Sequence, residues 1–200
     1  MRLGRVDMRR LRSRVGHVGP RHPLRSLLTV RDVVLTGLMA SVERVPPLSP
    51  TRDETAAAES LVDLRGLVDL REAHRPVLSR GQPTRALIAR SLMPSPWPLL
   101  LDDPATGLDV ADREQLIDRL EVLGLTRLEP ASVLVNRHLE ELPPGTTHAM
   151  LLRDGRCLVT GRVGEILAGL QASACFDHPV RFTQVDGWWS VRTRRPAPAE

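Results

Sequence analysis

Apolar residues recur three and four positions apart in several stretches of the chain, a spacing that is typical of amphipathic helices. The stretches are LTVRDVVLTGL at 28–38, ETAAAESLVDLRGLVDL at 54–70, PTRALIARSLM at 83–93 and ADREQLIDRLEVL at 111–123. In the last of them one helical face would carry Leu116, Ile117, Leu120 and Leu123, and the glycine at 124 predicts the helix end. Prolines at positions 46, 47 and 50 separate the first two helices, because proline lacks an amide donor.

Shorter apolar runs predict strands around these helices. The run before Asp102 is apolar on both faces, which is typical of a strand inside a parallel sheet. We expect a second buried strand in ASVLVN at 131–136 and a brief strand in VGHVG at 15–19. Asp-Gly pairs at 154–155 and 186–187 lie between apolar runs and predict two β-hairpins, with a helix in RVGEILAGL between them. Strands and helices in this order predict an α/β fold.

The composition fits a folded domain of ordinary size, since 42% of the 200 residues are hydrophobic and can bury a core. Charged residues or prolines interrupt every apolar run before it reaches the roughly 18 residues that a membrane-spanning helix needs. The N-terminal segment is rich in arginine but has neither the apolar stretch nor the cleavage site of a secretory signal. Cys157 and Cys175 lack the spacing of a zinc site, so we expect buried free thiols.

The net charge of +4 raises the question of nucleic-acid binding. The 28 basic residues are scattered among 24 acidic ones instead of forming a stripe. The absence of tyrosine and the presence of only two phenylalanines leave few surfaces on which bases could stack. We therefore expect no nucleic-acid partner. All the basic residues in this count are arginines, since the sequence contains no lysine.

Two segments carry candidate chemistry. Asp102 and Asp103 follow the buried apolar run, and a carboxylate at the end of such a strand is a rigid ligand for the Mg²⁺ of a nucleotide triphosphate. The alternative is a solvated turn after a strand. The segment LSRGQ at 78–82 precedes a helix, and unpaired amides at a helix start attract anions. Ser79 could also be an ordinary N-cap of that helix.

Three segments resemble, in their order and spacing, motifs of the ATP-binding cassette (ABC) ATPases. LSRGQPTRALIARSLM resembles the signature helix, LLLDDPATGLD the Walker B strand with its D-loop, and MLLRDGRCLVTG the final hairpin. The resemblance, which runs from about Val15 to Gly161, implies an incomplete P-loop NTPase (RecA-like) parallel sheet with an inserted helical subdomain. The domains it implies are a remnant of the RecA-like core at 1–22, a helical subdomain with the signature at 23–95, the core with Walker B and D-loop at 96–168, and a hairpin and tail at 169–200.

The resemblance also implies ATP and Mg²⁺ as cofactors and gives each matching residue a role. Asp102 would hold Mg²⁺, and Asp103 stands where the family usually has a glutamate that activates the attacking water. The γ-phosphate of ATP held by a second subunit would meet the signature residues Ser79, Arg80, Gly81 and Gln82. Asp109 corresponds to the D-loop aspartate that links two sites across a dimer, and it could also cap the helix at 111–123.

The sequence departs from the family at several functional positions. The GxxxxGK[ST] loop that grips the phosphates needs a lysine, so these 200 residues do not contain it, and the family order would put it before residue 1. Pro20 stands in the place of the Q-loop glutamine and has no side-chain amide. Asp103 is one methylene shorter than glutamate, which would weaken hydrolysis. Arg137 takes the switch-histidine position; His138, the catalytic candidate, follows one residue later, where side-chain direction along a strand reverses.

Three functions fit these observations. The first is an ABC ATPase subunit that energises transmembrane transport by hydrolysing ATP at a dimer interface, with its phosphate loop encoded upstream of Met1. The second is a non-catalytic half that supplies its signature motif to an intact partner, and the third is an inactive remnant. The resemblance implies a second ABC ATPase subunit, identical or different, and transmembrane permease subunits as partners. It implies a cytoplasmic location, at the inner face of the plasma membrane.

Overall fold

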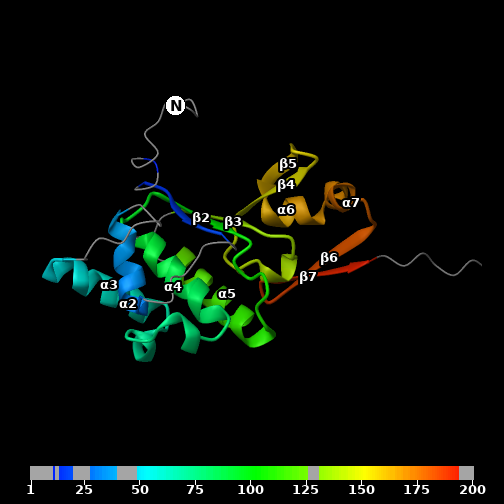
Figure 1. The fold of residues 1–200 in the computed structure, drawn as a ribbon. Helices are drawn as coiled ribbons and strands as arrows, with labels where there is room; N and C mark the ends of the chain where they lie inside the picture. The colour runs from blue at the N-terminus through cyan, green and yellow to red at the C-terminus, as the bar shows by residue number, and fades with distance from the viewer. Residues whose placement is uncertain (1–10, 12–13, 20–27, 40–48, 126–130, 194–200) are drawn as a thin grey trace, which may run out of the picture. The chain divides into compact units, whose positions relative to one another are not determined.

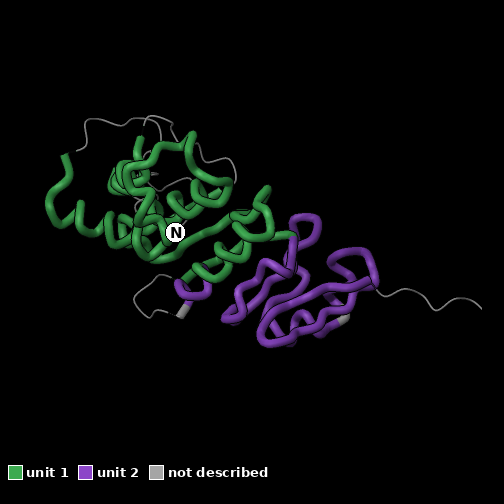
Figure 2. Tube along the Cα trace, turned by 90° about the horizontal axis from the view of Figure 1, so that it is seen from below, with its two compact units in different colours: residues 1–119, 126–137 green, residues 120–125, 138–200 purple. Residues whose placement is uncertain are grey.

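The computed structural model describes residues 11, 14–19, 28–39, 49–125 and 131–193, shown as a ribbon in Figure 1. The chain divides into two compact units, which Figure 2 colours separately. Unit 1 comprises residues 1–119 and 126–137, and unit 2 comprises residues 120–125 and 138–200. The four domains expected from the resemblance divide the chain differently, and the two units do not test them. The four domains therefore stay a prediction.

A parallel sheet forms the centre of unit 1, with the strand order β1-β2-β3 in the part of the chain that the structure describes. The strands are β1 (Gly16–Val18), β2 (Pro98–Asp102) and β3 (Ala131–Val135). Strand β2 is central, because Leu100 pairs with His17 on one side and with Val133 on the other. All three strands lie where the apolar runs predict them.

The expectation that β3 is a buried strand is wrong. Val133 is 53% exposed and Val135 is 46% exposed, whereas Leu99 and Leu101 of β2 are almost fully buried. Within the described residues β3 lies at the edge of the sheet, so it has a paired neighbour on one side only. An apolar strand sequence does not reveal how many neighbours the strand has.

Helices of unit 1 share one apolar core. They are α2 (Val30–Leu35), α3 (Arg52–Leu64) and α4 (Gly81–Leu92), joined by the short 3-10 helices η1 (Thr36–Met39), η2 (Val68–Leu70) and η3 (Arg75–Val77). The buried residues of this core are Val30, Val34, Leu35, Ala58, Val62, Leu67, Leu78, Ala86, Ala89 and Met93. Helix α4 also packs against β1, and Figure 1 shows these helices beside the sheet. The helical spacing in the sequence therefore predicts this subdomain correctly.

Close packing joins η1 to α4. A Cβ atom on Gly37 would lie 2.7 Å from the Cβ of Met93, so only glycine fits there without a shift of the neighbours. Next to it, Nε of Arg90 donates a hydrogen bond of 2.8 Å to the hydroxyl of Thr36. Burial lowers the pKa of the Arg90 guanidinium.

Helix α5 (Val110–Leu125) follows β2 and carries the expected apolar face. Leu116, Ile117, Leu120 and Leu123 are all buried. The prediction that the helix stops at Gly124 is wrong, because α5 includes this glycine and runs to Leu125.

Unit 2 contains two antiparallel hairpins. The first joins β4 (His148–Arg153) to β5 (Arg156–Arg162), and the second joins β6 (Val180–Val185) to β7 (Trp188–Thr193). Both Asp-Gly turns have positive φ angles, 51° and 72° at 154–155 and 50° and 86° at 186–187, as two-residue hairpin loops require. The two hairpin predictions are therefore confirmed.

The remaining elements of unit 2 are η4 (Leu139–Glu141), α6 (Val163–Ala168) and α7 (Leu170–Phe176). The sequence predicts α6, but α7 is missed, because its residues LQASACF combine small and polar side chains without a clear apolar spacing. Leu151 of β4, Ile166 of α6 and Ala172 of α7 form a buried apolar core. Both cysteines are free, but the expectation that they are buried is wrong, since Cys157 is exposed and Cys175 is half-buried.

None of the helices in the described part of the chain has the length and apolar character required to cross a membrane.

Candidate functional site

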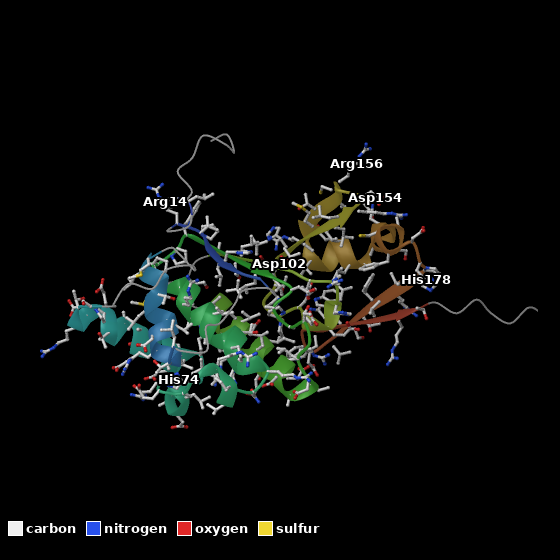
Figure 3. All side chains as sticks on the ribbon, viewed as in Figure 1. Arg14, His74, Asp102, Asp154, Arg156 and His178 are labelled. Carbon is white, nitrogen blue, oxygen red and sulfur yellow. The ribbon has the colours of Figure 1, made fainter. Side chains whose placement is uncertain are left out.

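Asp102 is the last residue of the central strand and its side chain is exposed (Figure 3). Residues alternate between the two faces of a strand, so the burial of Leu99 and Leu101 puts Asp102 on the opposite face. Among the described residues no group of three or more His, Cys, Asp and Glu side chains could hold a metal ion. A Mg²⁺ site on a nucleotide needs only one or two protein carboxylates, because phosphates and water supply the other ligands. Asp102 fits the role of that single carboxylate.

Asp103 is held in a different way from its neighbour. Its φ angle of 51° lies in the left-handed region, where a side chain other than glycine is uncommon. Its amide donates a hydrogen bond of 2.7 Å to the carbonyl oxygen of Val135, and its own carbonyl accepts one of 3.2 Å from the amide of Thr106. The first bond continues the ladder between β2 and β3, and the second closes a turn that begins at Asp103. The Asp103 side chain is only 12% exposed.

An ion pair connects Asp103 to Arg137. The Nη2 atom of Arg137 lies 2.6 Å from Oδ2 of Asp103, a distance at the short end for a charge-assisted hydrogen bond. Arg137 follows β3 by two residues, and β3 is the parallel neighbour of β2. The carboxylate that the family resemblance assigns to water activation therefore accepts a hydrogen bond from a cation of its own chain, which opposes taking up a proton from water.

The signature segment begins α4 in an unexpected way. The helix starts at Gly81, with Arg80 at the N-cap position and no side-chain bond from it to the helix. The alternative that Ser79 caps this helix is wrong. The amide of Ser79 instead donates a hydrogen bond of 2.7 Å to the side-chain carbonyl of Gln82, and Pro83 lies in the first turn as expected.

The carboxylate of Asp112 occupies the start of this helix. The Ser79 hydroxyl lies 3.3 Å from Oδ1 and 3.4 Å from Oδ2 of Asp112, and the Gly81 amide donates a hydrogen bond of 3.0 Å to Oδ2. A Cβ atom on Gly81 would lie 2.8 Å from the carboxyl carbon of Asp112, so the close approach requires glycine. The two groups that the resemblance assigns to a phosphate already bind an anionic side chain.

Asp109 fixes the position of Asp112. Its side-chain Oδ1 accepts a hydrogen bond of 2.9 Å from the amide of Asp112, and its carbonyl accepts one of 3.0 Å from the amide of Arg113. Asp109 therefore caps α5, which confirms one of its two expected roles. The other role, a link across a dimer, stays a prediction.

Asp112 also acts electrostatically on the buried side chain of Arg85. Burial lowers the pKa of the Arg85 guanidinium, the negative charge of Asp112 acts in the opposite direction, and the positive charge of Arg119 adds to the lowering. The Asp112 carboxylate thus neutralises part of the charge that α4 carries into the interior.

Sequence reasoning missed Asp112 as a site residue, as well as the partner of Arg137. A signal existed for both. Once Asp109 is taken as a helix cap, Asp112 falls in the first turn of that helix, where carboxylates are common. Residues that follow neighbouring parallel strands lie at the same edge of the sheet, so Asp103 and Arg137 could have been paired.

The structure does not test the remaining two candidates, His138 and Pro20. His138 is exposed and belongs to unit 2, whereas Asp102 and Asp103 belong to unit 1. Its catalytic role stays a prediction. Pro20, the residue in the place of the Q-loop glutamine, lies outside the described residues.

The fold and these residues are those of the P-loop NTPase class: a parallel sheet with helices, a carboxylate at the end of the central strand, and the segment LSRGQ at the start of a helix. Solved structures have the same fold. An inward-facing metal-chelate type ABC transporter matches with a TM-score of 0.73 and 20% identity over 92% of this chain and 73% of that chain. A dimeric ATP-binding cassette bound to ADP and Pi matches with a TM-score of 0.63 and 22% identity over 80% of this chain and 68% of that chain.

Curated relatives give the family. No family model matches the chain. It is 34% identical over 149 residues to the uncharacterized ABC transporter ATP-binding protein YlmA of Bacillus subtilis, a match that covers 74% of this chain and 56% of YlmA. It is 33% identical over 171 residues to the methionine import ATP-binding protein MetN of Streptomyces griseus, covering 84% of this chain and 45% of MetN. The chain belongs to the ATP-binding cassette family, and it spans about half the length of these two relatives.

Proposed function

We propose that the chain is a subunit of an ABC transporter that pairs with a second cassette and lends its signature helix to the nucleotide of that partner. Hydrolysis takes place at the partner's site, and this chain's own site turns over ATP slowly or not at all. The observation that carries the proposal is the ion pair of 2.6 Å between Arg137 and Asp103. A carboxylate engaged by a guanidinium is a poor acceptor for a proton of water.

Each side chain has a definite task in this proposal. Asp102 holds Mg²⁺ on ATP, for which its exposed position at the end of β2 is suited. Ser79 and Gly81 offer a hydroxyl and an amide to the γ-phosphate of the nucleotide on the partner, at the positive end of α4. Arg80 lies between these two donors and Gln82 follows them, and Asp109 connects the two sites.

The partners of this proposal are a second cassette, identical or different, and transmembrane permease subunits. The chain itself would lie in the cytoplasm, at the inner face of the plasma membrane. Support comes from the names of similar proteins, which include methionine import and molybdenum import ATP-binding proteins. These names differ in the transported compound, so they give the class of process rather than a substrate for this chain.

A second candidate function is an ATPase subunit that hydrolyses ATP at its own site. The exposure of Asp102 favours it, since this carboxylate is available for Mg²⁺. His138 would then act as the switch histidine in place of Arg137. The two candidates differ in whether turnover depends on residues of this chain's Walker B strand or of its signature.

The test is an ATPase assay in which the chain is added to a purified complete ABC ATPase subunit from the same genome. We expect the chain to raise the turnover rate of that subunit. Ser79→Ala should remove this increase, because it deletes the hydroxyl that faces the partner's nucleotide. Ser60→Ala is the matched control, since Ser60 is an exposed serine on α3 whose hydroxyl donates a hydrogen bond to the carbonyl of Ala56 in the same helix.

Two results would contradict the proposal. One is the absence of any rate increase with every complete cassette subunit of that genome. The other is an increase that Ser79→Ala leaves intact and that Asp102→Asn abolishes, which would support hydrolysis at this chain's own site instead.

A further inference from the structure

We propose that Asp112 is an internal competitor for the phosphate position of the signature helix, so that a phosphate binds there only after the Asp112 carboxylate has left. The inference deepens the proposed function, and it rests on it, because it concerns regulation of the same helix start. It assigns a regulatory role to a residue outside the signature, Walker B and D-loop segments.

The geometry matches that of a bound anion. The carboxylate accepts hydrogen bonds from the hydroxyl of Ser79, at 3.3 and 3.4 Å, and from the amide of Gly81, at 3.0 Å. Carboxylate and phosphate oxygens are acceptors of the same kind, and both are stabilised at a helix N-terminus. One amide hydrogen and one hydroxyl hydrogen cannot bond fully to both anions at the same time.

Repulsion adds to this competition. A phosphate that approached the Ser79 hydroxyl and the Gly81 amide would come within about 4 Å of the Asp112 carboxylate, where like charges repel by about 1 kcal/mol in water and more near a protein surface. The unfavourable energy falls away when the carboxylate moves or becomes neutral. Asp112 is only half-buried, so its side chain has solvent on one side into which it can turn.

The D-loop holds the competitor in place. The side chain of Asp109 accepts the amide hydrogen of Asp112 at 2.9 Å, so the cap of α5 fixes the backbone from which the carboxylate reaches α4. Asp109 is exposed and is the residue expected to contact a partner. If a partner draws the Asp109 side chain away, the first turn of α5 loses its cap and Asp112 is released from the signature. Binding of a second cassette would thus open the phosphate position on this chain.

Other charges nearby limit how the proposal can be tested. Arg85 and Arg119 lie close enough to act on the same region, and the Asp112 charge partly compensates the buried guanidinium of Arg85. Removal of the whole side chain could therefore weaken packing as well as open the site. Asp112→Asn keeps the size and one acceptor oxygen and removes only the charge.

The experiment is a titration of the full chain with inorganic phosphate, in which the NMR chemical shift of the Gly81 amide reports binding. The variants are Asp112→Asn, Asp112→Ala and the control Asp118→Asn, which removes the same charge from an exposed site on the same helix. We expect Asp112→Asn and Asp112→Ala to bind phosphate at least about tenfold more tightly than the wild type, as removal of a like charge at this distance implies. Asp118→Asn should behave as the wild type. Adding Ser79→Ala to Asp112→Asn should reverse the gain, which a purely structural role of Asp112 would not predict.

Equal phosphate affinity in the wild type, Asp112→Asn and Asp112→Ala would overturn the proposal, as would a gain that Asp118→Asn reproduces. Thermal unfolding of each variant identifies any that fails to fold. If Asp112→Ala fails to fold, the phosphate affinity of Asp112→Asn, which removes only the charge, tests the proposal. The titration contains no second cassette, so it succeeds or fails independently of the ATPase assay above. A phosphate gain without any effect on a partner cassette would leave Asp112 as a competitor and reject the proposed function alone.

Discussion

Adjacent residues at the end of β2 have opposite surroundings, although both are aspartates. Asp102 is exposed, whereas the Asp103 side chain is 12% exposed and paired with Arg137. The backbone of Asp103 is left-handed, and its carboxylate pairs with an arginine that follows β3. Sequence alone shows two carboxylates and an arginine 34 positions later, but not that they meet.

A double-mutant cycle measures the ion pair. We expect Arg137→Gln and Asp103→Asn to destabilise the chain less in combination than the sum of the single effects, with a coupling of roughly 1 kcal/mol. The value is modest because the Arg137 side chain is 79% exposed to solvent. Urea unfolding gives the free energies. Arg156→Gln, at an exposed arginine of β5, serves as the control and should change stability by less than about 0.5 kcal/mol. Additive effects of Arg137→Gln and Asp103→Asn would mean that the pair does not form in solution.

At the scale of elements, the packing of η1 against α4 depends on a residue without a side chain. Gly37→Ala would put a Cβ atom 2.7 Å from the Cβ of Met93, and we expect a loss of about 1–3 kcal/mol from overpacking. Gly124→Ala is the matched control, because nothing lies within 4 Å of a Cβ atom at that helical position. Alanine there should raise stability by about 0.5–1 kcal/mol. Thermal unfolding of both variants measures the effects, and similar shifts in both would rule out the close contact.

The elements show which features a sequence reveals and which it hides. Local patterns predict the strands, the two Asp-Gly hairpins and the apolar face of α5, because periodicity and turn chemistry act over a few residues. The exposure of β3 is not predicted, since it depends on which strand lies next to it in space. Helix α7 is missed because its small and polar residues give no clear period. The Asp112 contact joins residues 31 and 33 positions apart, which only the folded chain brings together, at the starts of α4 and α5.

At the scale of the whole molecule, the described groups of the candidate site fall in unit 1, and His138 falls in unit 2. The resemblance predicts the fold and the family correctly, because three ordered motifs constrain the chain over most of its length. It does not predict the state of the site, because an ion pair at Asp103 and a carboxylate at the signature arise from residues that the motifs do not include. Family membership and catalytic competence are therefore separate questions for this chain.

The central proposal is that this chain does not hydrolyse ATP with its own carboxylate, because Arg137 forms an ion pair with Asp103. The most direct measurement is the ATP turnover of the purified chain with Mg²⁺, compared with that of Asp102→Asn, after circular dichroism has shown that both are folded. We predict the same background rate for both proteins. Turnover by the wild-type chain that Asp102→Asn abolishes would contradict the account.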